Sequence, residues 1–509
     1  MYQRVQLLKS PDSTGIVQYP VRGRGSGGAV GDKLVPMEPK DSALSRRGML
    51  TGGVALAAQS GALLAQTKPA QSKSAAPGRK YRGWVSRGTG PGRTTLQELT
   101  LRPIGGRQIV VRTEATNLCY SNSSDVLGLP QPGFPPPPPA SASGSEKAAP
   151  PRPVPPGVLA LSRMALIQGH GGVGIVEAVG PEVRRVQVGD RVCVSGTPQC
   201  GSCYQCLRGR ADMCQFLGRQ GPNDLVPIAD MRDGTAVYAN SHIGGLAELM
   251  VTFEEWVVPV FTKASAADLG MVCSCVSVAG LGCTASQVLA EVGIGSIVAV
   301  VGCGPLGLSA IQGARIAGAS TIIAIEPIRA RREVALKVGA THVLDPNVEG
   351  EKLVEKVREL SNGPNDRLWA GGRDSGGLLG GAGADFVVEA VGADRAKPKL
   401  EAGPDPTGIL PIQQAYMMCA PGGHIVTTSL PTGNVTLPAV VFAIGGRTHH
   451  AGQYGGANPM RDIPRFVELL DKRQFDARSL ATTIVPIEGM LDAYQQVIDR
   501  TTVTALMTA

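Results

Sequence analysis

The chain has 509 residues, of which 4% are aromatic, and its formal net charge is +8. That length leaves room for two or three domains with sizeable hydrophobic cores. The charge is modest for so long a chain, and no apolar run approaches the roughly 20 residues needed to span a bilayer. We therefore expect neither nucleic-acid binding nor a membrane span.

Residues 1–80 read as an N-terminal extension that carries an export signal and a linker. Arg46 and Arg47 precede residues 51–65, which are apolar and uncharged, and this is the pattern of a twin-arginine signal. The chain would then work in the periplasm or outside the cell. The alternative is a chance Arg-Arg pair in a cytoplasmic protein. Met37 is a second candidate start, because it gives the signal a basic segment of ordinary length.

A β-rich region follows the extension. Residues 96–101 and 109–113 are strand-like and flank a Pro-Ile-Gly-Gly sequence, which predicts a hairpin. Residues 129–156 include five consecutive prolines and predict a surface insertion without a packed core. Strands are expected again at residues 174–179 and 191–194.

Closely spaced cysteines form the most specific signal in the chain. Four of them share one short stretch, namely Cys200, Cys203, Cys206 and Cys214. Four thiolates are the preferred shell of a structural zinc ion, and two-residue gaps let the sulfurs converge on one point. Disulfides are the rival interpretation for an exported protein, but cysteines this close in sequence pair poorly. The pattern predicts a structural zinc site.

A strand–turn–helix–strand unit forms the second strong signal. Five apolar residues at 297–301 precede the turn Gly302-Cys303-Gly304-Pro305-Leu306-Gly307, after which apolar residues recur at helical spacing. A second apolar strand at residues 321–325 ends on Glu326. In a dinucleotide-binding unit the first glycine permits the turn, the second lets the backbone approach the pyrophosphate, and the third lets helix pack on strand. The sequence therefore predicts a Rossmann domain.

The acidic residue after the second strand bears on the cofactor. A carboxylate at Glu326 can bond a ribose diol and repels a 2′-phosphate, which favours NAD. Arg329, Arg331 and Arg332 follow closely and keep NADP open. NAD is therefore the expected cofactor and NADP the alternative.

These features occur in the order typical of a known family. The chain resembles the zinc-dependent alcohol dehydrogenases of the medium-chain dehydrogenase/reductase family in three features: the segment Gly169-His170-Gly171-Gly172-Val173-Gly174, the four closely spaced cysteines and the Gly302 turn. The resemblance implies an α/β fold with a GroES-like β-rich catalytic domain and a Rossmann doubly wound parallel sheet. By the same resemblance, residues 81–275 and 445–509 form the catalytic domain, and residues 276–444 bind the nucleotide.

The resemblance also implies a second, catalytic zinc ion. Its ligands map onto Cys119, His170 and Cys275, with Cys273 as a nearby alternative to the last, so two zinc ions per chain are expected. Two sulfurs, one imidazole and an open position suit a Lewis-acid zinc. Ser121 matches the hydroxyl that takes the alcohol proton.

Several positions depart from the family pattern. Gly171 stands where glutamate is common, and Asn122 replaces an aspartate that orients the ligand histidine. Ser124 replaces a histidine that ends the proton relay in some members. Tyr120 and Thr504 fall where some members have arginines facing the pyrophosphate.

The resemblance implies an enzyme that interconverts an alcohol and an aldehyde or ketone by hydride transfer to or from NAD. Its partners would be a small-molecule substrate and further copies of the chain, as a dimer or tetramer. One alternative is a zinc- and nucleotide-binding protein without turnover, which the departures favour. Another is a related dehydrogenase acting on polyols or thiol adducts.

Overall fold

The structure is a computed structural model that describes residues 77–129, 161, 163–219, 223–286, 291–361 and 383–509. The twin-arginine stretch and the proline-rich insertion predicted from the sequence fall outside these residues, apart from the insertion's first residue. All of the described residues belong to one compact unit of the chain.

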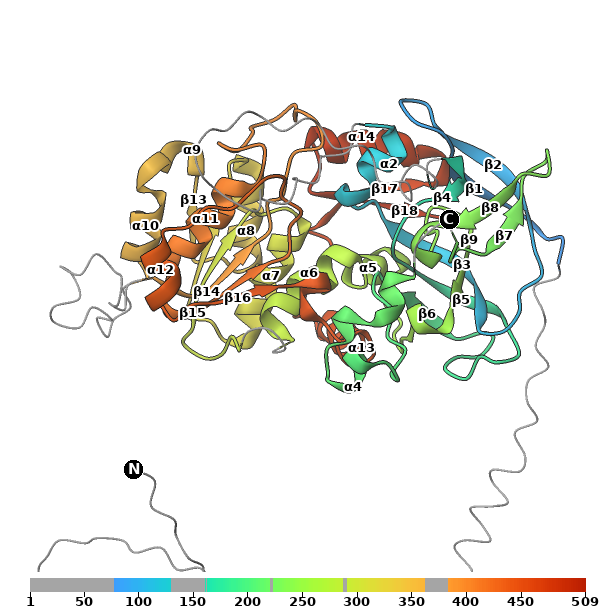
Figure 1. The fold of residues 1–509 in the computed structure, drawn as a ribbon, viewed down its shortest axis with the longest axis horizontal. Helices are drawn as coiled ribbons and strands as arrows, with labels where there is room; N and C mark the ends of the chain where they lie inside the picture. The colour runs from blue at the N-terminus through green and yellow to red at the C-terminus, as the bar shows by residue number, and fades with distance from the viewer. Residues whose placement is uncertain (1–76, 130–160, 162, 220–222, 287–290, 362–382) are drawn as a thin grey trace, which may run out of the picture. The chain divides into compact units, whose positions relative to one another are not determined.

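The strands of the first half of the described chain lie in two β-sheets, the second of which also includes the last two strands of the chain (Figure 1). One is a closed barrel in the order β1 (Lys80–Ser86), β2 (Thr94–Leu101), β7 (Pro227–Asp230), β8 (Ala236–Ala239) and β4 (Ala165–Ile167). The other has β10 (Val257–Pro259), β6 (Arg191–Val194), β5 (Gly172–Val179), β3 (Gln108–Asn117), β18 (Thr504–Thr508) and β17 (Ala481–Pro486) in order, with β9 (Leu249–Phe253) also paired to β3.

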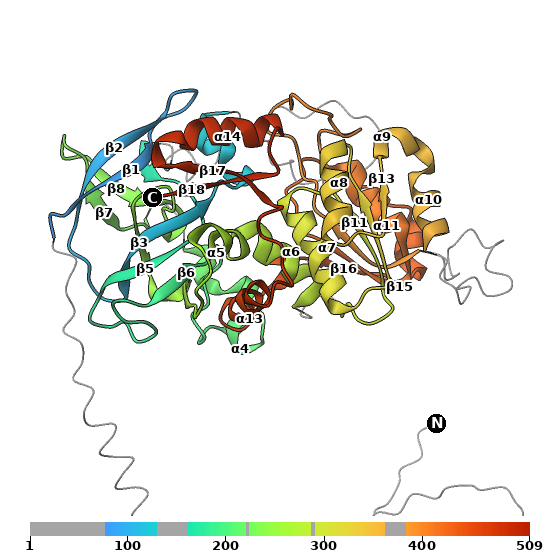
Figure 2. The same cartoon turned by 180° about the vertical axis from the view of Figure 1, so that it is seen from behind.

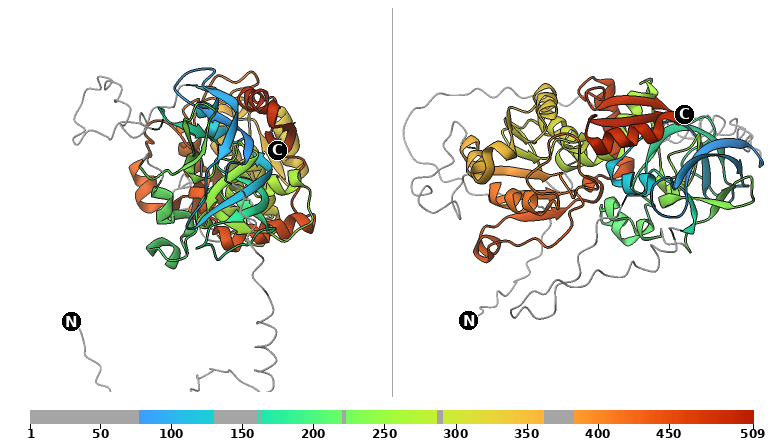
Figure 3. Two further views of the ribbon diagram at one scale, coloured as in Figure 1. Left: turned by 90° about the vertical axis from the view of Figure 1, so that its right-hand side faces the viewer. Right: turned by 90° about the horizontal axis from the view of Figure 1, so that it is seen from above.

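The second sheet joins distant parts of the sequence. Strand β18, at the end of the chain, pairs antiparallel with β3, where Leu506 lies opposite Asn117. Figure 2 shows the red C-terminal strands beside β3 from behind, and Figure 3 shows them from above. Strands from both ends of the described chain therefore share this sheet.

The hairpin predicted between residues 96–101 and 109–113 is wrong. Strand β2 pairs with β1 and β7 in the barrel, whereas β3 pairs with β5, β9 and β18 in the other sheet. A local turn signal marks a change of direction but does not specify the partner of the following strand.

A six-stranded parallel sheet forms the part of the chain that the sequence predicts to bind a nucleotide. Its order is β13 (His342–Leu344), β12 (Thr321–Ile325), β11 (Ile297–Val301), β14 (Ala384–Glu389), β15 (Cys419–Thr427) and β16 (Thr448–Ala451). Its helices include α7 (Pro305–Ala317), α8 (Arg329–Val338), α9 (Pro346–Glu349), α10 (Leu353–Leu360), α11 (Ile409–Met418) and α12 (Ala439–Ile444). Every residue of β11 is buried, and alternate residues enter the hydrophobic cores on opposite faces of the sheet. A continuous apolar run is what such a strand requires.

The position of β16 differs from the boundary that we expected between the nucleotide-binding and catalytic parts. We expected the catalytic part to resume at residue 445, but β16 pairs with β15 and is the last strand of the parallel sheet. The nucleotide-binding sheet therefore extends to Ala451. The strand is short, largely exposed and contains two histidines, so its sequence lacks the apolar run that marked β11.

Helices α5 (Ala266–Val272) and α6 (Cys275–Ala285) connect the two parts. Helix α6 packs against α7 so closely that a Cβ at Gly280 would lie 2.2 Å from the carbonyl oxygen of Leu306. The element that begins at Cys275 is thereby fixed against the glycine turn.

Two helices complete the C-terminal segment, α13 (Pro459–Asp471) and α14 (Met490–Asp499), and α14 packs on α2 (Ser123–Leu127). Within the described ranges, no single helix is long and apolar enough to cross a membrane. Helices α5 and α6 meet that criterion only when joined across a 51° bend.

Candidate active site

Three predicted metal ligands, distant in sequence, meet in one cluster. The donor atoms of Cys119, His170 and Cys275 all lie within 4.8 Å of one another. Cys119 follows β3 and caps the short helix η1 (Tyr120–Asn122), His170 lies just before β5, and Cys275 begins α6. The cluster therefore depends on two strands and the connecting helix.

Asn122 and Ser121 orient the cluster. Asn122 Oδ1 is hydrogen-bonded to His170 Nδ1, which leaves Nε2 directed toward the other donors. Ser121 Oγ lies 3.2 Å from Cys119 Sγ and 3.5 Å from His170 Nε2. The Asn122 amide thus makes the contact that an aspartate makes in the family pattern, and the Ser121 hydroxyl lies beside the donors.

The pKa values of the three clustered side chains are shifted in different directions. The hydrogen bond with Cys275 is the main reason that the pKa of Cys119 lies well below its ordinary value, while burial opposes the shift and the charge of His170 adds to it. The same bond, with burial, raises the pKa of Cys275 well above the ordinary value. Burial acts to lower the pKa of His170, but the Cys119 thiolate outweighs it and the net shift is upward.

This donor set fits zinc. Two sulfurs and one imidazole nitrogen are the ligands of zinc sites that keep a fourth position for substrate. Cys273, the alternative in the sequence, is not part of the cluster, and the Cys193 thiol donates to its carbonyl oxygen instead. The structure thus places Cys275, rather than Cys273, beside the other two donors.

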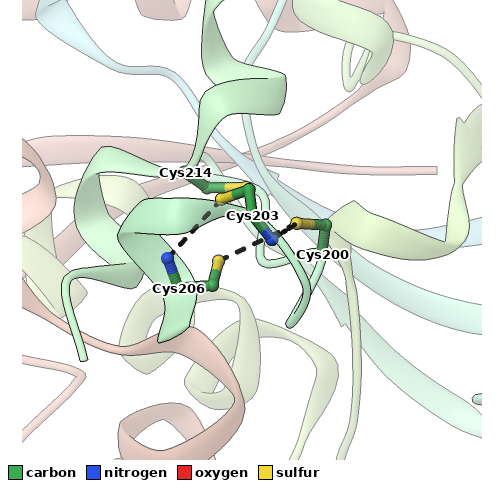
Figure 4. A group of neighbouring side chains, drawn as sticks. All are labelled: Cys200, Cys203, Cys206 and Cys214. Carbon is green, nitrogen blue, oxygen red and sulfur yellow. Dashed lines mark hydrogen bonds between the residues drawn. The ribbon is translucent and has the colours of Figure 1, made fainter. Parts of the chain in front are cut away.

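The closely spaced cysteines form a second cluster on an exposed lobe (Figure 4). The sulfurs of Cys200, Cys203, Cys206 and Cys214 lie within 4.8 Å of one another. Backbone N–H groups point at them: Cys203 N lies 3.3 Å from Cys200 Sγ, and Cys206 N lies 3.5 Å from Cys203 Sγ. Burial acts to raise the pKa of Cys203, but N–H groups from Gln215 and Cys206 lower it to about 6.

The sulfur separations favour one metal over disulfides. Sγ–Sγ distances are 4.0 Å for Cys200–Cys206 and 3.9 Å for Cys203–Cys214. A disulfide needs about 2.05 Å, whereas a tetrahedron with metal–sulfur bonds of about 2.3 Å has sulfurs about 3.8 Å apart. All eleven cysteines lie among the described residues and are free.

The glycine turn after β11 has the form that a dinucleotide requires. Gly302 has φ 91°, and a Cβ at Gly307 would lie 1.8 Å from the carbonyl oxygen of Gly302, so α7 packs directly on the turn. Gly304 caps α7 ahead of Pro305 and Leu306, and the nearest atom to a Cβ there is Arg331 Nη1 at 3.9 Å. The helix N-terminus is therefore open to an approaching phosphate.

Glu326 and Arg331 lie beside this turn. Glu326 is 3% exposed, and its carboxylate accepts hydrogen bonds from Cys303 N at 2.7 Å and Ile328 N at 3.0 Å. Arg331 Nη2 donates to the Thr502 carbonyl, and its buried Nε has no partner among the described residues. An acid and a partly unpaired guanidinium thus border the expected cofactor site.

The two positions that lack the family's arginines have other partners. Tyr120 Oη accepts from Arg395 N at 2.8 Å, and Thr504 Oγ1 accepts from Asn117 Nδ2 at 3.1 Å. Ser124 is buried.

Residues in the segment 393–408 form ion pairs with the C-terminal segment. Asp394 pairs with Arg500, and Lys399 Nζ lies 2.5 Å from Asp499 Oδ2. No local pattern marks such pairs, because their partners are about a hundred positions away.

Comparison with known proteins agrees with this geometry. The model described as "Alcohol dehydrogenase GroES-like domain" matches residues 105–262, and the one described as "Zinc-binding dehydrogenase" matches residues 305–472. Together they span more than half of the chain. The chain belongs to the zinc-type medium-chain dehydrogenase/reductase family. As a member of this family it is an oxidoreductase.

Relatives extend the match over most of the chain. Alcohol dehydrogenase B of Mycobacterium tuberculosis is 27% identical over 412 residues, which is 80% of this chain and 92% of the relative. The NDMA-dependent alcohol dehydrogenase of Amycolatopsis methanolica is 28% identical over 343 residues, covering 66% and 82% respectively. Benzyl alcohol dehydrogenase from Acinetobacter calcoaceticus shares the fold with a TM-score of 0.63 at 22% identity, covering 84% of this chain and 99% of that one.

Proposed function

We propose that this family member interconverts an alcohol and an aldehyde or ketone by hydride transfer with NAD, and that it holds two zinc ions per chain. The convergence of Cys119, His170 and Cys275, with the Ser121 hydroxyl beside them, carries the proposal. The glycine turn packs against the middle of α6 at Gly280, so the helix that begins at the donor Cys275 also contacts the expected cofactor turn.

Each residue near the cluster has a distinct task. A zinc ion held there would act as a Lewis acid that lowers the pKa of the alcohol oxygen. Ser121 Oγ, 3.2 Å from one donor and 3.5 Å from another, is placed to accept the alcohol proton. Asn122 Oδ1 accepts a hydrogen bond from the His170 Nδ1–H group, which leaves Nε2 free to act as a ligand.

The structural role belongs to the cysteine lobe. Two of its sulfur pairs lie 4.0 and 3.9 Å apart, close to the separation in a tetrahedral site, and backbone N–H groups stabilise negative charge on Cys200 and Cys203. NAD is favoured because Glu326 places a carboxylate at the end of β12, where a ribose would lie.

The proposal is tested by metal content and turnover together. Wild-type protein should contain two zinc ions and produce NADH from at least one alcohol in a panel of primary, secondary and aromatic alcohols. Cys119→Ala should lose one zinc ion and at least a hundred-fold in kcat (about 3 kcal/mol), while its circular dichroism stays unchanged. Cys283→Ala, which alters a buried cysteine outside both clusters, is the matched control.

A second function is favoured by the substitutions around the cluster. Asn122 carries no charge and Ser124 cannot titrate near neutral pH, so these two side chains support proton transfer less strongly than an aspartate and a histidine would. The rival is a zinc- and nucleotide-binding protein without turnover. Full metal and nucleotide binding, with no NADH formed from any alcohol, would establish it.

A further inference from the structure

Tyr454 occupies an unusual place at the end of the nucleotide-binding sheet. It lies in the short helix η7 (Gln453–Gly456), just after β16, and has φ 52° and ψ 31°. A residue with a Cβ adopts this left-handed conformation at a cost. The side chain is nevertheless 5% exposed, so the surrounding contacts hold it there.

The hydroxyl of Tyr454 reaches the catalytic part. Its Oη lies 3.3 Å from both Ser195 Oγ and the Gly196 backbone nitrogen, immediately after β6. Ser195 Oγ also donates to the Thr197 carbonyl at 2.9 Å. The tyrosine therefore supplies the acceptor for the Gly196 N–H group inside the protein.

Gly196 brings this tyrosine against a metal donor. A Cβ at Gly196 would lie 2.9 Å from the His170 carbonyl oxygen, 3.2 Å from Tyr454 Cε2 and 3.6 Å from His170 Cδ2. The three residues thus pack together with no room for a side chain at position 196. Gly196 therefore lies between the Tyr454 ring and His170.

The backbone of η7 meets the helix of the third donor. A Cβ at Gly455 would lie 1.9 Å from the Ala279 carbonyl, and one at Gly282 would lie 2.8 Å from the Gly455 carbonyl. Both contacts are to α6, which begins at Cys275. Tyr454 therefore contacts the segment that packs against His170, and Gly455 contacts the helix that begins at Cys275, although both residues directly follow the last strand of the parallel sheet.

We infer that Tyr454 is a positioning residue that holds the His170–Cys275 side of the metal cluster in register with the nucleotide-binding domain. The inference rests on the proposed function, because hydride transfer requires substrate and cofactor to be aligned to within a fraction of an ångström. The hydroxyl holds residues 195–196 in place, and the left-handed backbone brings η7 onto α6.

Tyr454→Phe tests the inference by removing only the hydroxyl. We expect kcat to fall about ten-fold while KM for the alcohol changes little, because the loss affects alignment rather than substrate contacts. In cobalt-substituted protein, the visible absorption of the catalytic-site ion should shift, because the segment at Gly196, which packs against His170, loses its hydrogen bonds to the Tyr454 hydroxyl. Tyr81→Phe is the control: Tyr81 is buried in the barrel, and its hydroxyl has no partner among the described residues.

Gly196→Ala approaches the same contact from the other side. The added methyl group would press on the His170 carbonyl and on the Tyr454 ring, so the variant should show the same spectral shift and kcat loss. Combined with Tyr454→Phe, its effect should be less than additive, because both changes act on one contact.

The outcomes separate this inference from the proposed function. If Tyr454→Phe lowers only Tm and keeps the wild-type kcat and cobalt spectrum, the tyrosine is merely structural and the inference is wrong. If wild-type protein shows no turnover, the proposed function fails, and the cobalt spectra of the two variants alone decide the inference.

Discussion

Glu326 shows how one side chain can serve both the local fold and the choice of cofactor. Its carboxylate accepts hydrogen bonds from Cys303 N in the glycine turn and from Ile328 N ahead of α8. The sequence predicted its position after the second strand, because a buried strand that ends on an acid is readable from residue order. Its hydrogen bonds to the turn were not readable, since they depend on the side-chain conformation.

Glu326→Ser should move cofactor preference toward NADP. Serine removes the charge that repels a 2′-phosphate, and Arg331 stands next to the turn. The ratio of kcat/KM for NADP over NAD should rise at least ten-fold, about 1.4 kcal/mol. Two backbone N–H groups also lose their acceptor, so Tm should fall by about 2–4 °C.

Glu333→Ser is the matched control for this change, because Glu333 is exposed on α8 and, within the part of the chain that the structure describes, pairs only with Arg329, in an i,i+4 ion pair. It should leave both the cofactor ratio and Tm near their wild-type values. A wild-type enzyme that works ten-fold better with NADP would contradict our interpretation of Glu326.

Among the elements, those with strong local signals were predicted and those defined by distant pairing were not. The strand at 297–301, the glycine turn and α7 appear as expected, because strand burial and helix capping depend on residues that are close together in the sequence. The hairpin before β3 was wrong, and β16 was missed, because partner choice and edge position are properties of the whole sheet.

The cysteine lobe should depend on its metal. Residues 200–214 form this lobe; their helices, α4 (Tyr204–Leu207) and η2 (Ala211–Met213), are short, and Tyr204 and Leu207 are exposed, so the lobe has little apolar core of its own. Cys203→Ser should therefore lose one zinc ion and lower Tm by roughly 5–10 °C. Zinc content and thermal unfolding measure both effects.

Ser202→Ala controls for the Cys203 substitution. Ser202 lies in the same loop and its hydroxyl contacts Cys200 Sγ at 3.7 Å, but it is not one of the four clustered sulfurs. It should retain two zinc ions. A Cys203→Ser protein that is equally stable and fully loaded would show that the lobe does not hold a structural metal.

At the scale of the whole molecule, the catalytic part is assembled from both ends of the described chain. Strand β18 completes a sheet begun by β3, and α14 covers α2. The order of motifs along the sequence predicted this arrangement through family resemblance. The contacts of Tyr454 and of residues 393–408 were not predicted, because they form only when the two parts meet.

The protein must bind metal and cofactor and bring both chain ends together before it can act, and this requirement bears on where in the cell it works. We propose that Arg46, Arg47 and the apolar residues 51–65 export the protein by the twin-arginine route. That route carries folded proteins, so zinc would bind the thiolates in a reducing compartment before the cysteines meet oxidants. The cofactor would travel already bound.

Cell fractionation tests this proposal. Wild-type protein should appear outside the cytoplasm, shortened to begin after about residue 65, whereas an Arg46→Lys/Arg47→Lys variant should stay inside at full length. Arg79→Lys, a basic residue beyond the signal, should leave export unchanged. If wild-type protein and the double variant both remain in the cytoplasm with residues 37–65 attached, the twin-arginine interpretation is wrong. The cofactor would then be drawn from the cytoplasmic pool, and there would be no need for it to be carried with the protein.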